Sequence, residues 1–199
     1  MRALSRLHTL CAGFCLLGAA SAAFAQDEES AAEAPMAFES PAVTELTVLR
    51  SSRSDVPDTI TVETAEIPEE LPRILSNKDA DRLMRNEGIT LQWISWEERG
   101  PAWVAVANTG HWLLMAGQYG EDQSNLDLEG FITEIGEDYF VFEGTIRMRG
   151  APTKDRVCSA TKPWRFEVTQ NRSYYRLREF EWCDYLTDYI DVYFDPALR

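Results

Sequence analysis

Hydrophobic and polar residues alternate in about eight short runs over the second half of the chain, and turn-forming residues interrupt the runs roughly every ten positions. This alternation is typical of strands that bury only one face. The runs cover residues 89–94, 103–107, 112–115, 126–132, 140–148, 164–168, 174–182 and 189–194. The pattern predicts an all-β fold, namely an antiparallel up-and-down barrel of about eight strands, with a β-sandwich as the alternative.

The clearest alternation lies in the fifth run. One face carries Phe140, Phe142, Ile146 and Met148, and the other carries Glu143, Thr145, Arg147 and Arg149. A slip by one residue would move every apolar side chain to the polar face, so the register of this strand is strongly specified. A longer loop over residues 150–162 is expected to follow it and to carry Cys158.

One short α-helix is expected before the first strand. Ser76 can cap its N-terminus, and Asp79 stands at the third helical position, where its side chain can reach back as in a capping box. The helix is expected to span residues 76–87, with Gly88 ending it and Leu83 facing the core. We therefore expect a barrel domain over residues 73–199 that begins with this helix.

The first 25 residues have the features of a secretory signal peptide. Arg2 and Arg6 precede an apolar stretch over residues 10–20, and Ala23-Phe24-Ala25 gives a small-x-small cleavage pattern. No segment of the chain is apolar over the roughly 20 residues that a membrane-spanning helix needs. The sequence therefore predicts an exported protein without a transmembrane segment, in the periplasm first and in the extracellular space as the alternative.

Residues 26–72 form an acidic segment with scattered prolines. Twelve of its residues are acidic, and its only basic residues are Arg50 and Arg53. Such a composition buries too little apolar surface to offset the entropy of ordering, so we expect a disordered arm. Residues 45–49 and 59–62 depart from this pattern, because their β-type composition would suit docking onto a sheet edge.

The charge of the chain narrows the classes of partner. The formal net charge is −14 and becomes more negative when Arg2 and Arg6 leave with the signal segment. Nucleic acids and anionic lipids are repelled by such a surface, so neither is expected as a partner. The acidity supports solubility, and it would also suit a basic protein partner.

Four cysteines and two histidines limit the available chemistry. Two of the cysteines lie in the signal segment, and the remaining pair, Cys158 and Cys183, is expected to form a disulfide in an oxidising compartment. A metal site is the competing interpretation, but neither cysteine belongs to a C-x-x-C pair and zinc normally takes three or four protein ligands. We expect no metal and no cofactor.

Catalytic signatures are weak. His111 follows a turn and has no nucleophile motif beside it, and we find no G-x-S-x-G or glycine-rich phosphate loop in the sequence. Carboxylates near the C-terminus, Asp184, Asp188 and Asp191, are the candidates for a carboxylate-based hydrolase. Acidic pairs arise by composition in so acidic a chain, so we assign no catalytic residue.

Aromatic and basic residues in the predicted strands are the remaining candidates for a binding site. Six tryptophans lie in the β region and can either fill a small barrel or line a pocket. Arg176 and Arg178 share one face of a strand, where they either pair with glutamates or line a site for an anionic group. The candidate ligand-binding set is Trp93, Trp112, Phe142, Tyr175, Arg176 and Arg178.

Two segments resemble a group of exported, uncharacterised proteobacterial proteins. They are residues 86–96 (NEGITLQWISW) and 175–194 (YRLREFEWCDYLTDYIDVYF), and the resemblance covers roughly residues 74–194. It implies a bacterial periplasmic address and supplies no activity or site residues. In architecture alone the chain also resembles lipocalin-like barrels, without their opening Gly-x-Trp signature.

These observations favour a non-enzymatic exported barrel that binds a small apolar or amphipathic ligand in its interior. The alternative is a periplasmic protein-interaction module, an inhibitor or an envelope factor, that meets a basic partner through its acidic arm or an exposed aromatic face. A cavity in the barrel would favour the first hypothesis, whereas a filled core with an apolar outer patch would favour the second.

Overall fold

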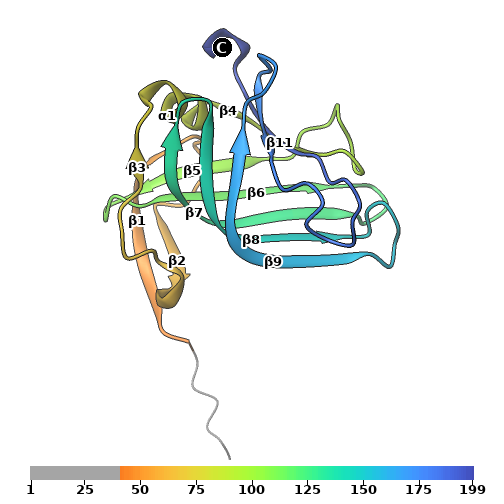
Figure 1. Cartoon of the computed structure of the whole chain (residues 1–199). Coiled ribbons are helices and arrows are strands. Elements are labelled where there is room, and N and C mark those ends of the chain that lie inside the picture. Colours follow the sequence, from red (N-terminus) through yellow and green to blue (C-terminus); the bar gives the residue numbers. More distant parts are fainter. Residues whose placement is uncertain (1–40) are drawn as a thin grey trace, which may run out of the picture. The chain divides into compact units, whose positions relative to one another are not determined.

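The computed structural model describes residues 41–199 (Figure 1), so the expected signal segment and the first part of the acidic arm lie outside the described residues. The strands are β1 (Val43–Ser51), β2 (Thr59–Glu63), β3 (Arg73–Ile74), β4 (Asn86–Leu91), β5 (Ala102–Ala107), β6 (Trp112–Tyr119), β7 (Asn125–Gly136), β8 (Tyr139–Arg149), β9 (Val157–Glu167), β10 (Tyr174–Leu177) and β11 (Ile190–Phe194). The helices are α1 (Asn77–Met84) and two 3-10 turns, η1 (Thr64–Glu66) and η2 (Pro196–Leu198). Within the described residues, no helix has the length and apolar character needed to cross a membrane.

All strands except β3 belong to one continuous path of hydrogen-bonded neighbours. The order is β2-β1-β5-β6-β7-β8-β9-β10-β11-β4, and the short β3 pairs in parallel with β7. From β5 to β11 each strand pairs antiparallel with the next one in the chain, which is an up-and-down arrangement. The predicted all-β fold with one short helix is confirmed.

The sheet curves on itself without closing into a continuous ladder. Its β4 end reaches the start of β5 only at one isolated bridge, where Ile89 and Gly100 exchange backbone hydrogen bonds of 2.9 Å. A closed barrel would need β4 to pair along β5, but β1 occupies that edge of β5. The sequence prediction of a barrel is therefore corrected to an open, barrel-like sheet.

The inner face of the curved sheet is filled with large side chains. The fully buried ones include Phe140, Phe142, Trp164, Phe166, Tyr175 and Phe194. The Phe140 and Phe166 rings stack with centroids 4.9 Å apart. β7 and β8 bend sharply in Figure 1. Gly130 of β7 pairs with Gly144 of β8, and a Cβ on Gly144 would lie 2.6 Å from the Phe142 ring. This close approach requires glycine.

A second, smaller core lies on the outer face of the sheet. Leu46 of β1 and Ile60 of β2 are buried there with four side chains of the central strands, Ala105, Ala107, Leu113 and Phe131. The two segments of β-type composition therefore dock as strands, because each presents an apolar residue that the outer face of β5–β7 can cover. The ordered sheet begins at Val43, earlier than the start at residue 73 expected from the sequence.

α1 packs at one end of the sheet, and its N-terminus is capped. Ser76 is its N-cap and accepts a hydrogen bond from the Asp79 backbone N–H. The helix ends at Met84, three residues before the expected end, because the chain pairs with β11 from Asn86 onward. Gly88 lies in β4, where a Cβ would approach the Gly100 carbonyl oxygen to 2.4 Å.

Two expected boundaries also move. Cys158 lies in β9, so the loop that was expected to extend to residue 162 ends at Arg156. β10 ends at Leu177, and the residues that were expected to continue this strand to Trp182 form an irregular loop that runs to β11.

Candidate functional site

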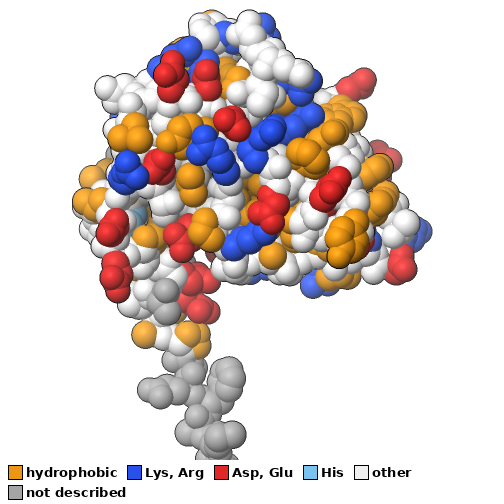
Figure 2. Space-filling model, in the orientation of Figure 1, with side chains coloured by type: hydrophobic (Ala, Val, Ile, Leu, Met, Phe, Trp, Pro, Cys, Tyr) orange, Lys and Arg blue, Asp and Glu red, His pale blue; other side chains and the backbone are white. Residues whose placement is uncertain are grey.

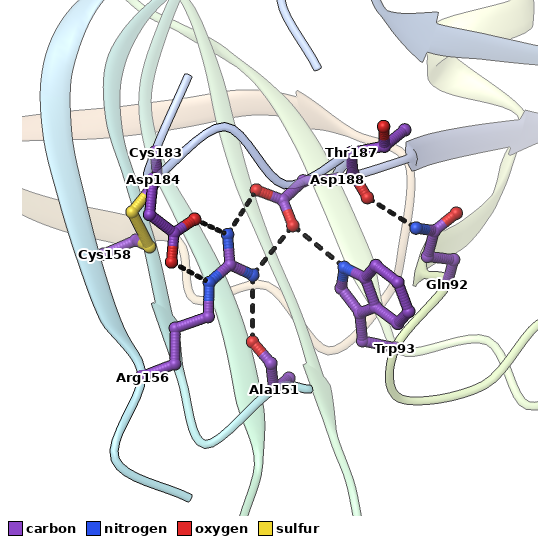
Figure 3. A network of polar contacts seen from close by, with 9 residues as sticks. All are labelled: Gln92, Trp93, Ala151, Arg156, Cys158, Cys183, Asp184, Thr187 and Asp188. Atoms are coloured by element: carbon purple, nitrogen blue, oxygen red, sulfur yellow. Dashed lines mark hydrogen bonds and ion pairs between the residues drawn. A yellow bond between two sulfur atoms is a disulfide. The ribbon is translucent and has the colours of Figure 1, made fainter. Parts of the chain in front are cut away.

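Two loops at one end of the sheet contact each other. The first, residues 92–101, joins β4 to β5, and the second, residues 178–189, joins β10 to β11. The Gln92 side-chain amide donates to the Thr187 carbonyl, and the Trp93 indole N–H donates to Asp188 at 2.9 Å (Figure 3). Both loops lie on the right of Figure 1. They form a single surface unit, although they are about 90 residues apart in sequence.

Arg156 holds the second loop from inside. Its guanidinium makes two hydrogen bonds to Asp184 (2.9 and 2.7 Å), two to Asp188 (2.8 and 2.8 Å) and one to the Ala151 carbonyl (2.9 Å), as Figure 3 shows. All five N–H donors are used. The Arg156 side chain is 4% exposed and that of Asp188 is fully buried. The hydrogen bonds that Arg156 donates to Asp188 and Asp184 raise the pKa of Arg156 against the effect of burial, and the bonds to Asp184 lower the pKa of that carboxyl.

The expected disulfide is present and adjoins this ion network. Cys158 and Cys183 are bonded across a separation of 25 residues. Arg156 stands two residues before Cys158, and Asp184 directly follows Cys183, so the covalent link brings the cation and its first carboxylate together (Figure 3). The two sulfurs and an Asp184 oxygen lie within 4.8 Å of one another. A metal would need free thiolates, which the disulfide does not offer.

Exposed apolar side chains stand on the two loops. Trp93 is 39% exposed, Trp96 45%, Tyr185 90% and Leu186 39%. We call these four residues the aromatic loop surface. Figure 2 shows orange side chains with red carboxylates between them on the right, where the loops lie in Figure 1. Asp184 and Tyr185 have φ angles of 32° and 62°, a region that costs free energy for residues other than glycine.

Arg176 lies beside this surface in a cluster of aromatic rings. Its guanidinium carbon is 4.0 Å from the Tyr189 ring centroid and 5.6 Å from that of Trp96. Beneath the rings it makes two hydrogen bonds of 2.7 Å to Asp191, whose side chain is fully buried. Burial raises the pKa of Asp191, although the charge of Arg176 opposes the shift. The cluster fixes the position of Trp96 at the rim of the loops.

An acidic hollow of about 450 Å³ opens next to Trp93. Its walls are the first loop and the β6–β7 turn at residues 120–124, and its carboxylates are Glu98, Glu121 and Asp122. The buried Gln118 forms its floor and donates hydrogen bonds to the carbonyls of Ser95 and Glu98. We call this the acidic hollow.

The structure separates the six residues proposed from the sequence for ligand binding. Trp93 lies in the first loop and Arg176 lies in β10 near Trp96, whereas Phe142 and Tyr175 are fully buried in the core. Trp112 is 8% exposed, with the Arg50 guanidinium 5.8 Å from its ring centroid. Arg178 is an exposed partner of Glu167 at 3.3 Å. The six side chains therefore do not line one common interior space.

The three C-terminal aspartates also have separate roles. Asp184 and Asp188 share the Arg156 guanidinium, and Asp191 pairs with Arg176. His111 is buried, with its ring nitrogens within hydrogen-bond distance of the Thr109 hydroxyl and the Pro68 carbonyl. Sequence reasoning did not single out Arg156. The predicted disulfide was the available signal, because pairing Cys158 with Cys183 places Arg156 near Asp184.

Comparison with known proteins identifies the family. No solved structure matches the chain. The uncharacterised protein PM1083 of Pasteurella multocida (strain Pm70) is 32% identical over 129 residues, which is 64% of this chain and 80% of that protein. The PM1083 family model matches residues 71–194, a range that includes both loops and Arg156. The expected resemblance to an uncharacterised proteobacterial family is confirmed, and the chain belongs to the PM1083 family.

Proposed function

We propose that this protein is an exported, non-enzymatic interaction module that binds a basic protein through the aromatic loop surface. The observation that carries the proposal is the exposure of four large apolar side chains, Trp93, Trp96, Tyr185 and Leu186, on two loops that a buried ion pair and a disulfide hold to the sheet. Aromatic side chains of this kind are the usual anchors of protein interfaces.

The packing of the interior supports binding on the outside. A ligand inside the sheet would have to displace side chains such as Phe142 and Trp164, which are fully buried. Displacing close-packed core side chains costs several kcal/mol. The filled core with an apolar outer patch matches the interaction hypothesis better than the interior-ligand hypothesis.

The rigidity of the loops reduces the entropy cost of binding. Arg156 makes four hydrogen bonds to Asp184 and Asp188 of the second loop, and the Gln118 amide holds the first loop through the carbonyls of Ser95 and Glu98. A surface that is already ordered loses less conformational freedom on association than a flexible one. These contacts would therefore favour binding if the loops present one fixed surface to a partner.

Charge indicates what kind of partner fits. The chain has a formal net charge of −14, and carboxylates of the acidic hollow adjoin Trp93. A basic protein would be steered towards this face, and an acidic protein would be repelled. The signal-like residues 1–25 and the disulfide support export, because disulfides persist in oxidising compartments.

Quantitative capture with matched variants tests the proposal. Tagged wild-type protein, the Trp96→Ala/Tyr185→Ala variant and the Val157→Ala/Leu49→Ala control are expressed in the cells that make the protein. The control residues are also exposed, at 61% and 69%, and lie in β9 and β1 outside the two loops. We expect a basic protein to copurify with the wild type and the control, and its yield to fall strongly with the loop variant. Retention by all three proteins, or capture of no specific protein, would overturn the proposal.

A native mass spectrum of the protein from the same cells addresses the interior-ligand hypothesis. The interaction proposal predicts the mass of the chain alone, or of the chain with a protein partner. A reproducible extra mass of small-molecule size that is lost on denaturation would instead support a carrier.

A further inference from the structure

We propose that the acidic hollow receives an arginine or lysine side chain of the partner, which stacks on Trp93 while Glu98 and Glu121 bind its charge. This inference rests on the proposed function, because it names the chemical group that the partner places beside the aromatic loop surface. It follows from the shape, the charge and the aromatic wall of the hollow.

The hollow has a defined shape. Gln118 at its floor is 2% exposed and accepts a hydrogen bond from the Leu91 backbone N–H, while its amide binds two carbonyls of the first loop. On the opposite wall, Asp122 accepts hydrogen bonds from the Ser124 backbone and hydroxyl at 3.1 and 2.6 Å. The walls are therefore held by residues that do not need a partner to order them, as preorganised sites require.

Two of the three carboxylates of the hollow, those of Glu98 and Glu121, have no ion pair within the described residues. The basic residue next to Glu98 in sequence, Arg99, pairs with Glu87 instead. The pKa of Asp122 is lowered mainly by the hydrogen bond from the Ser124 side chain, and the positive charge of Lys154 lowers it further. Glu98 and Glu121 are thus free to bind an incoming cation.

Trp93 supplies the aromatic wall. Its indole N–H is bound to Asp188, which is itself held by Arg156, so the ring cannot turn freely. A fixed indole next to carboxylates attracts a cation both through its face and through the charges. Arginine suits this combination best, because its planar group stacks on a ring while it donates two parallel hydrogen bonds to a carboxylate.

A titration with short peptides tests the inference. The probes are tetra-arginine amide and tetra-citrulline amide, which has the same shape without the charge. The readout is the NMR signal of the Trp93 indole N–H, assigned with Trp93→Phe. We expect saturable shifts of this signal with the arginine peptide and none with the citrulline peptide. A shift of equal size with both peptides, or no shift with either, would refute the inference.

A matched pair of variants separates local binding from general attraction. Glu98→Gln/Glu121→Gln should weaken binding of the arginine peptide about tenfold. Glu45→Gln/Glu63→Gln removes the same charge from exposed positions of β1 and β2 and should leave the affinity unchanged. Equal weakening in both variants would show attraction by net charge alone and would contradict the inference.

Failure of this inference can be distinguished from failure of the proposed function. If the Trp96→Ala/Tyr185→Ala variant loses the captured partner while Glu98→Gln/Glu121→Gln keeps it, the docking surface stands and the cationic side chain is wrong. If both variants keep the partner, the proposed function itself fails.

Discussion

Arg156 and Asp188 form a two-point ion pair inside the protein, with both N–O distances at 2.8 Å and side-chain exposures of 4% and 0%. The same Asp188 carboxylate accepts the indole N–H of Trp93. One buried pair therefore connects the disulfide-linked loop to an exposed aromatic side chain. This connection is the physical basis for treating the two loops as one surface.

Removal of Arg156 should strongly destabilise the protein. Arg156→Met leaves Asp188 buried without its cation, and breaking such a pair costs about 3–5 kcal/mol. Arg156→Lys should rescue little, because a lysine cannot make two parallel hydrogen bonds to each of two carboxylates. The free energy of unfolding, measured by urea denaturation, tests this.

The control for that prediction is Arg178→Met. The exposed Arg178 pairs with the half-buried Glu167 at 3.3 Å, so its removal should cost no more than about 1 kcal/mol. If Arg156→Met proves as mild as Arg178→Met, the ion network does not hold the second loop.

Loss of the disulfide should lower the melting temperature. The Cys158–Cys183 bond closes a segment of 25 residues, which corresponds to about 3 kcal/mol on the chain-entropy model. For a protein of this size the expected decrease is about 6–12 °C. Calorimetry of Cys183→Ala, and of the wild type with reductant, should show the same decrease; equal melting with and without reductant would count against the bond.

Asp79 should make the protein sensitive to acid. Burial raises its pKa, but hydrogen bonds from Ser76, Tyr175 and Arg82 outweigh this and hold the pKa below the usual 3.8. A lowered folded-state pKa gives stability that is fully present only well above the unfolded value of 3.8 and is lost as the pH falls through the folded value. The unfolding free energy should therefore fall between pH 5 and pH 3, roughly, and Asp79→Asn should reduce this dependence.

Asp81→Asn is the matched control for the acid prediction. Asp81 lies on the same helix, with a half-exposed side chain 3.6 Å from Arg85. Its variant should keep the pH dependence of the wild type. Identical pH profiles for Asp79→Asn and the wild type would show that Asp79 does not carry the effect.

Phe142→Ala should reveal whether the interior is packed. Phe142 is fully buried against Gly130 and Gly144, so truncating it leaves a cavity that costs about 3–5 kcal/mol. Val141→Ala, on the adjacent outward-facing position, should cost much less. If Phe142 instead lined a ligand space, its truncation would change stability little, and urea denaturation of both variants distinguishes the two cases.

The strands were predictable because their signal is local. Phe140, Phe142, Ile146 and Met148 alternate with polar residues, and all four are fully buried. The capping of α1 by Ser76 was likewise readable from neighbouring residues. The open form of the sheet could not be predicted in this way. It depends on the pairing of β1 with the edge of β5, and no local pattern fixes which strand pairs there.

The candidate site was only partly predictable, because its contacts join distant segments. Arg156 meets Asp184 and Asp188 across separations of 28 and 32 residues, with no periodicity to mark the pairing. The prediction of a long seventh strand over residues 174–182 was wrong, because β10 ends at Leu177 and the chain then forms the loop that these ion pairs hold. Trp93 and Arg176 were among the residues proposed from the sequence for ligand binding, and only the structure shows that Trp93 is partly exposed and that Arg176 packs beside Trp96.

Photo-crosslinking in the producing cells tests whether a protein partner docks on the aromatic loop surface. The crosslinking amino acid is placed at Trp96 and separately at the control position Leu49, which is exposed on β1. Mass spectrometry should find one discrete adduct with a basic protein at position 96 and none at position 49, and Tyr185→Ala should diminish the adduct. The same adducts at both positions, or none at position 96, would contradict docking on this surface.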